Sequence, residues 1–207
     1  MSRRRLAVTA VAALVVLLAS IAVGRSFVSS PPTATTARDQ PPETAPAPAA
    51  SQAPLPEGFV SFNESELGFS VAYPGTWKRL ASTDEEVRLL VADGTKVSLL
   101  VRVAPVGLTV TEDTLGIVRD LTDSLVRANP SVKLLSEPQP IALDDAPGYR
   151  YLYTFDAGDG RRGAHLHFLV FRRKRLIQLV FQVPGVRALE READLLDRIA
   201  GTFVAAP

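Results

Sequence analysis

The stretch GFSVAYPGTW, residues 68–77, contains the pattern on which the fold assignment depends. Its apolar residues alternate, so Phe69, Val71 and Tyr73 would share one face of a β-strand. The Pro-Gly pair that follows favours a turn. Trp77, the only tryptophan of the chain, comes directly after that turn. Because a large aromatic side chain buries much apolar area, the stretch predicts a strand, a tight turn and a return of the chain to a hydrophobic core.

The same stretch comes close to the nucleophile elbow of serine hydrolases, because Ser70 stands between Gly68 and Ala72 at nearly the required spacing. Such an elbow passes directly from a strand into a helix. Here the serine is followed by Val-Ala-Tyr-Pro, which continues the strand pattern and then breaks it. The local sequence therefore favours a structural role over a nucleophilic Ser70.

From residue 58 onward the sequence consists of short alternating runs separated by turn residues, which is typical of antiparallel strands. Strands are expected at residues 60–62, 69–73, 87–91, 96–103, 134–138, 149–155, 164–171 and 176–183. One helix would begin at Thr111, a plausible N-cap, and end at Asn129-Pro130. Its expected inward residues are Leu115, Val118, Leu121 and Leu125.

A second helix would follow Pro184-Gly185. Its apolar residues recur at helical spacing and would face the core: Leu189, Ala193, Leu196 and Ile199. A sheet with one helix inserted midway and another at its C-terminal end is an α+β layer structure. The expected fold class is therefore α+β, a mainly antiparallel sheet flanked by helices.

The glycine-aromatic strand that leads to Tyr73-Pro74 and Trp77 resembles the opening motif of PsbP/Mog1-like domains. The later elements have a similar order over residues 58–207: a long strand ending at Pro105, a helix, a strand starting at Pro147-Gly148-Tyr149, a long hairpin and a final helix leading to Gly201-Thr202-Phe203-Val204. The resemblance implies α/β/α layers. It also implies a binding role, because family members are mostly non-enzymatic: photosystem II extrinsic subunits, a Ran-binding import factor, secretion adaptors and actinobacterial envelope lipoproteins. Unlike those lipoproteins, this chain has no lipobox cysteine.

The N-terminal residues have the composition of a membrane anchor and a linker. Residues 1–5 contain three arginines and form the expected cytoplasmic tail, because positive charge favours that side. Residues 6–23 are uncharged and, at about 1.5 Å per helical residue, long enough for a transmembrane signal-anchor. Residues 24–57 are rich in Pro, Ala and Thr and are expected to be a disordered linker. The expected topology is single-pass in the cell membrane, N-terminus cytoplasmic, with residues 58–207 extracytoplasmic.

Two alternatives for this segment stay open. Ala22-Val23-Gly24 is an acceptable cleavage site for a signal peptide, and the arginines at positions 3 to 5 resemble a twin-arginine export signal.

The composition of the chain excludes several kinds of site and partner. The chain has no cysteine, which excludes disulfides, thiol catalysis and cysteine-ligated zinc. A formal net charge of +1 gives no reason to expect a nucleic-acid partner.

Two patterns known from cofactor and metal sites also occur. Residues 158–163 match GxGxxG, but they join two expected strands, so a hairpin turn is favoured over a dinucleotide loop. His165 and His167 would share a strand face, as a metal site could use, but no third ligand has a suggestive position. A metal-dependent enzyme built on this pair is therefore a minor alternative, and no cofactor is expected.

Polar residues at alternate strand positions suggest one apolar and one mixed sheet face. If the faces align, the mixed face would offer a ligand or partner site at Arg102, Arg150, His165, His167 and Gln178. A basic turn could contact anionic lipid or a wall polymer through Arg172, Arg173, Lys174 and Arg175. A solvated sheet face and a solvated turn are the simpler interpretations of the two patterns.

Together these features predict a membrane-anchored binding or scaffolding domain of the bacterial cell envelope without enzymatic activity. Its expected partners are the membrane, through the N-terminal helix, and a protein or a lipid or lipoglycan of the envelope. A lipid or lipoglycan carrier is the main alternative function.

Overall fold

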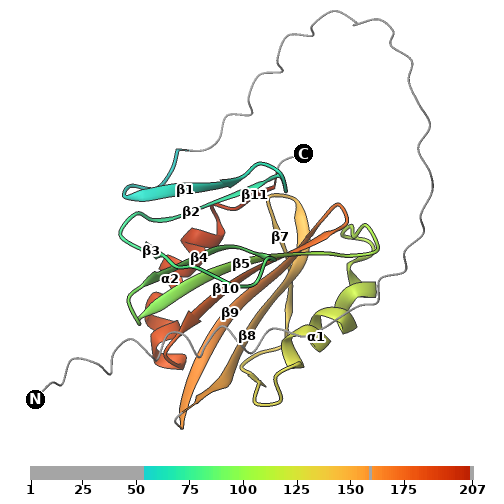
Figure 1. The fold of residues 1–207 in the computed structure, drawn as a ribbon. Coiled ribbons are helices and arrows are strands. Elements are labelled where there is room, and N and C mark those ends of the chain that lie inside the picture. The colour runs from blue at the N-terminus through green and yellow to red at the C-terminus, as the bar shows by residue number, and fades with distance from the viewer. Residues whose placement is uncertain (1–53, 159, 206–207) are drawn as a thin grey trace, which may run out of the picture. The chain divides into compact units, whose positions relative to one another are not determined.

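The computed structural model describes residues 54–158 and 160–205, which Figure 1 draws in colour. The expected cytoplasmic tail and signal-anchor, and most of the expected linker, lie outside these residues. Among the described helices, none combines the length and hydropathy that a membrane crossing requires.

The strands are β1 (Phe59–Glu64), β2 (Phe69–Pro74), β3 (Lys78–Arg79), β4 (Val87–Asp93), β5 (Val97–Pro105), β6 (Lys133–Leu134), β7 (Gln139–Leu143), β8 (Ala146–Gly158), β9 (Arg161–Arg172), β10 (Arg175–Val183) and β11 (Val204–Ala205). The helices are the 3₁₀ helix η3 (Leu115–Val118), α1 (Arg119–Arg127) and α2 (Val186–Ala200). The large sheet has the order β3-β4-β5-β10-β9-β8-β6, with β7 also paired to β8, and the small sheet has the order β1-β2-β11. Every strand pair is antiparallel, which confirms the expected α+β class.

The opening motif folds as a strand, a turn and a core anchor. Phe69 and Val71 on β2 are buried, and the amide of Trp77 donates a hydrogen bond to the carbonyl of Pro74 at 3.0 Å. Trp77 itself is 6% exposed and belongs to the main core cluster. Ser70 lies within β2, where it is paired with Asn63 of β1 and Val204 of β11. The structural interpretation of the motif is therefore confirmed, since this strand does not pass into a helix.

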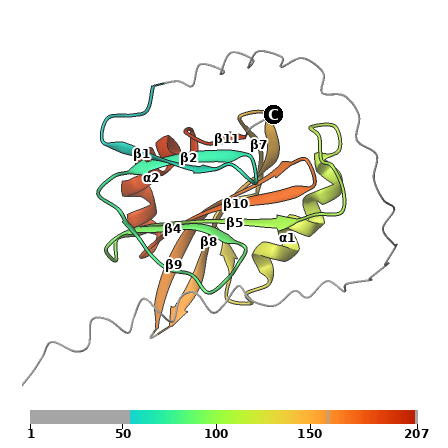
Figure 2. The same ribbon diagram turned by 45° about the horizontal axis from the view of Figure 1, so that its top comes forward.

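The large sheet separates two hydrophobic cores (Figures 1 and 2). On one face, α2 and β2 pack against the apolar side chains of β5, β9 and β10. The inward residues predicted for α2 are correct, with Leu189, Leu196 and Ile199 buried. On the other face, η3 and α1 cover the aromatic residues of β8. We call these the α2 face and the α1 face of the sheet.

The helix expected from Thr111 begins differently from the prediction. The chain first forms η3 and continues as α1 only from Arg119. A 3₁₀ helix has about 3.0 residues per turn and not 3.6, so it shifts which later residues face the sheet. Leu121, predicted to point inward, is 41% exposed, whereas the side chain of Thr122 is buried.

The other departures concern short edges and turns of the large sheet. The strand expected at residues 134–138 is wrong beyond Leu134: β6 ends there, residues 135–138 form no strand, and β7 follows, with β6 and β7 pairing with different parts of β8. The GxGxxG match lies in the link from β8 to β9, where Gly158 and Gly160 have φ values of 84° and 71°. The prediction of a hairpin turn is therefore confirmed for the described residues.

Candidate functional site

The strand register determines which predicted site residues share a face, because directly opposed residues of an antiparallel pair point to the same side. Arg102 of β5 is opposed to Gln178 of β10, and His165 of β9 is opposed to Gln182 of β10. His167 follows His165 at alternate spacing and is opposed to Tyr151 of β8. The register therefore places Arg102, His165, His167 and Gln178 on the α1 face.

Arg150 lies on the other side of the sheet. It is opposed to Phe168, whose ring packs in the core beneath α2. Its guanidinium lies 3.8 Å from Asp197 of α2 and 3.5 Å from the side-chain oxygen of Gln139. The expected convergence of Arg102 and Arg150 on one face is therefore wrong. Alternation within a strand shows which residues share a face of that strand, but it does not show which face of the assembled sheet this is.

Arg102 binds carboxylates of its own chain. Its Nη2 lies 2.5 Å from Glu86 and its Nε lies 3.4 Å from Asp84, both in the segment that leads into β4. The side chain is 21% exposed. The Nε group is buried and has no well-aligned hydrogen bond. The ion pairs with the carboxylates offset the cost of removing it from water. Arg102 therefore has a structural role: it holds the segment before β4 against the sheet.

The two histidines belong to a hydrogen-bonded relay of five side chains on the α1 face. Tyr153 Oη lies 2.9 Å from Nδ1 of His165 and 3.2 Å from Nδ1 of His167. The Nε2 atoms of His165 and His167 lie 3.0 Å from Oε1 of Gln182 and 3.1 Å from Oε1 of Gln178. We call this set the histidine relay.

The relay is consistent when both imidazoles are neutral. A neutral imidazole has one donor and one acceptor, and a tyrosine hydroxyl can donate to one neighbour while accepting from another. Each Nε2 then donates to a glutamine oxygen and each Nδ1 accepts, so the single hydroxyl proton of Tyr153 serves one Nδ1 at a time. Burial lowers the pKa of His165 to about 4 and that of His167 to about 3. Burial also raises the pKa of Tyr153 above its usual value, so the hydroxyl keeps its proton.

A metal would require a third ligand beside this pair. Within residues 54–158 and 160–205, no cluster of three His, Asp or Glu side chains could hold a metal ion. The four ring nitrogens already have partners in the relay. The described geometry therefore gives the metal-enzyme alternative no added support.

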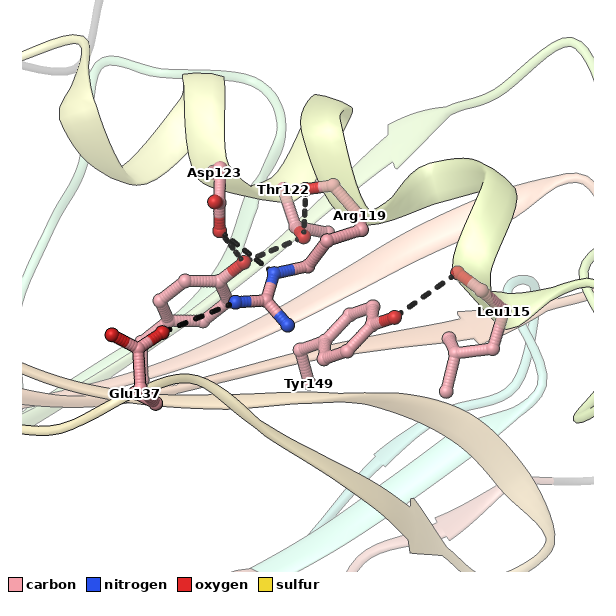
Figure 3. Close-up of polar contacts among 7 residues, drawn as sticks. Leu115, Arg119, Thr122, Asp123, Glu137 and Tyr149 are labelled. Carbon is pink, nitrogen blue, oxygen red and sulfur yellow. Dashed lines mark hydrogen bonds and ion pairs between the residues drawn. The ribbon is translucent and has the colours of Figure 1, made fainter.

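A second polar cluster, which was not among the predicted site residues, fastens α1 to the sheet. Tyr151 Oη donates to Oδ1 of Asp123 at 2.5 Å and lies 2.7 Å from Oγ1 of Thr122. Arg119 donates to the same Asp123 oxygen at 3.2 Å, and its guanidinium lies over the ring of Tyr149 (Figure 3). Burial, together with the hydrogen bond to Asp123, raises the pKa of Tyr151.

A signal for this cluster does exist in the sequence. Tyr149, Tyr151 and Tyr153 occupy alternate positions of one strand. Three phenols on one face need polar partners when they are buried. Strand alternation alone does not say that a helix supplies those partners.

Two open pockets occur on the described surface. A pocket of about 180 Å³ between α2 and the sheet is mostly apolar, and one of about 210 Å³ near β3 and β4 is mostly polar. Ligand pockets typically have about 300–1,000 Å³, so both are small for a lipid or lipoglycan. The first is lined by Arg150, Leu152, Leu166, Leu189, Glu190 and Ala193.

The predicted basic turn is the link between β9 and β10. Arg173 and Lys174 are exposed, while Arg172 and Arg175 are partly buried. Arg175 donates to the carbonyl of Leu67 at 3.1 Å, and the carbonyl of Lys174 accepts from the amide of Val106 at 2.8 Å. Part of this turn therefore has a structural role, through Arg175 and the backbone of Lys174.

Comparison with known proteins identifies the fold. No protein-family model matches the chain, and no curated protein matches its sequence. The solution structure of cyanobacterial PsbP (CyanoP) from Synechocystis sp. PCC 6803 matches with a TM-score of 0.58 and 17% identity, over 77% of this chain and 99% of that chain. LpqN of Mycobacterium tuberculosis, described as involved in cell envelope biogenesis, matches with a TM-score of 0.54 and 10% identity, over 72% and 91%. The Ran-binding protein Mog1p of Saccharomyces cerevisiae matches with a TM-score of 0.47 and 10% identity, over 71% and 95%. The chain therefore has the PsbP-like fold expected from residues 68–77.

Proposed function

We propose that the chain is a membrane-anchored binding or scaffolding domain of a bacterial cell envelope and has no enzymatic activity of its own. One observation carries this proposal. The polar side chains that gather on the sheet bind one another: the histidine relay joins neutral groups, and Arg102 binds Asp84 and Glu86. Such satisfied groups hold a scaffold in shape, whereas acid–base catalysis needs a group poised to exchange a proton with a substrate.

Two further arguments support the location. The uncharged residues 6–23 and the Pro-rich residues 24–57 have the composition of an anchor and a linker that hold a domain away from a membrane. LpqN, which shares the fold, is described as involved in cell envelope biogenesis. The fold shared with LpqN and the composition of residues 6–57 together favour an envelope location for this chain.

The location is tested with reporters fused after Pro207 in the full chain. A reporter that works only outside the cytoplasm should be active there, and a strictly cytoplasmic reporter should be silent. The opposite pattern would refute the proposed topology.

The binding role is tested by crosslinking in intact cells that make the full chain. A scaffold should give discrete protein adducts, and the purified chain should carry no stoichiometric lipid by mass spectrometry. Apolar ligand retained at one equivalent, without protein adducts, would instead establish the carrier alternative. The two small pockets argue against that outcome.

A further inference from the structure

The outer side of η3 and α1 carries apolar residues that the fold does not require. Ile117 is 75% exposed and Leu121 is 41% exposed, four positions further along the chain. Ile117 belongs to η3 and Leu121 to the first turn of α1, so the two lie close together along one helical segment. The side that faces the sheet is already provided by Leu115, Val118 and Thr122. Neither Ile117 nor Leu121 is therefore needed to bury the helix.

The second helix of the same domain provides an internal comparison. After its first residue, Val186, every exposed position of α2 is charged: Arg187, Glu190, Arg191, Asp194, Asp197 and Arg198. Both helices come from one chain and have one side packed on the same sheet. Val186, at the first position of α2, is 37% exposed, but no apolar residue of α2 is as exposed as Ile117. The difference therefore distinguishes the outer side of α1 from an ordinary solvated helix side.

The charge around Ile117 and Leu121 is negative. Between Thr111 and Arg127, the last residue of α1, the chain has four carboxylates and two guanidinium groups, those of Arg119 and Arg127. Arg119 is already bound to Asp123. Three of the carboxylates are exposed: Glu112, Asp113 and Asp120. We call Ile117 and Leu121, with these three carboxylates, the acidic α1 surface.

This surface is held in a fixed position. Asp123 and Thr122, on the inner side of α1, bind the hydroxyl of Tyr151 in the sheet, and the carbonyl of Leu115 accepts a hydrogen bond from Tyr149 at 3.3 Å (Figure 3). A surface whose backbone is fixed before binding loses less conformational entropy when a partner docks. The polar contacts beneath α1 therefore present the acidic α1 surface in one orientation.

We propose that the acidic α1 surface binds a basic and apolar segment of a protein partner. Two apolar side chains would insert between apolar residues of that segment, and its lysines or arginines would face Glu112, Asp113 and Asp120. The same negative charge repels anionic lipid headgroups, and it repels the identical surface of a second copy. This inference rests on the proposed binding role and adds to it a surface and the chemistry of the partner.

The cellular test uses the full chain with a photo-crosslinking amino acid at position 117 and, as the matched control, at the exposed position 194 of α2. We expect an adduct at position 117 whose partner peptide, identified by mass spectrometry, is apolar and net basic. Adducts only with lipid, only with a second copy or only with acidic peptides would overturn the inference. Adducts at position 194 without any at position 117 would overturn it too, but would leave the proposed binding role standing.

The chemical test measures binding of two synthetic amphipathic peptides to the full chain in detergent, one of leucine and lysine and one of leucine and glutamate. The lysine peptide should bind more tightly, and Ile117→Asn with Leu121→Gln should weaken it at least tenfold. Val186→Asn, which changes an exposed apolar residue of α2, should have no such effect. Asp113→Lys with Asp120→Lys should reverse the peptide preference. Equal binding of both peptides, or no loss in the first variant, would refute the inference.

Discussion

Acid should destabilise this domain through the histidine relay, and the size of the effect follows from the folded-state pKa values. Both rings are neutral in the folded state, with pKa values of about 4 for His165 and about 3 for His167. In the unfolded chain a histidine has a pKa of about 6.5. Between pH 6.5 and 4 the unfolded state therefore binds protons that the folded state does not. The free energy of unfolding must fall as the pH falls through this window.

The magnitude depends little on the exact folded-state pKa. Each group contributes about 1.36 kcal/mol per pH unit below its unfolded pKa until the folded state begins to protonate. At pH 5, about 1.5 units below 6.5, each histidine should cost about 2 kcal/mol, and the pair about 4 kcal/mol. Typical domains have only about 5–15 kcal/mol of stability. The relay should therefore dominate the response of the domain to mild acid.

The assay is urea unfolding of residues 58–207, followed by the fluorescence of the single, buried Trp77, at several values between pH 8 and pH 5. The control is the double variant His165→Asn with His167→Asn, because asparagine keeps a polar group near the position of Nδ1 but does not titrate. Its stability should change much less over the same range. A wild-type loss below about 1 kcal/mol at pH 5, or an equal loss in the variant, would refute neutral buried histidines.

Four other predictions concern the frame of the domain. Residues 58–207 expressed alone should unfold in one cooperative transition without reductant or metal, and a broad transition would contradict an independent domain. Trp77→Ala should cost about 3–5 kcal/mol by urea unfolding, because its ring is buried, and a loss under about 1 kcal/mol would contradict that burial. Gly148→Ala should prevent stable folding, because a Cβ there would overlap the carbonyl of Leu169 and lie 2.8 Å from Cα of Val170; a soluble variant with wild-type stability would be inconsistent with this strand spacing. Arg102→Gln should lower the unfolding midpoint more than Arg150→Gln, because Arg102 has carboxylates at 2.5 and 3.4 Å whereas the carboxylate beside Arg150 is 3.8 Å away, and equal effects would argue against that difference.

Local periodicity was sufficient to predict most strands and the inner side of α2. The alternation of β5 and the helical spacing of Leu189, Leu196 and Ile199 depend on residues close in sequence. The same holds for the turn before Trp77, where Pro and Gly restrict the backbone. Short-range patterns therefore predicted the elements of this fold well.

The candidate site was harder to predict because it depends on how strands are matched. Within β8, alternation separates Arg150 from Tyr151, but only the register with β9 shows that Tyr151 faces His167 and Arg150 faces Phe168. A shift of one residue would exchange these faces. The error for Leu121 has a different origin, since the 3₁₀ turn before α1 changes the angular position of every later residue. Neither the register nor that turn is visible in a single local pattern.

The two faces of the large sheet are stabilised by different means, and this explains why its polar residues resemble a site. Beneath α2 the contacts are apolar, and they permit many small adjustments because dispersion has little directionality. Beneath α1, Tyr151 and Tyr153 need hydrogen-bond partners once they are buried, and Asp123, Thr122 and the two histidines provide them. Hydrogen bonds are directional, so this side determines the orientation of α1 as well as its attachment. The clustered polar residues therefore fix the position of a helix whose exposed side carries Ile117 and Leu121.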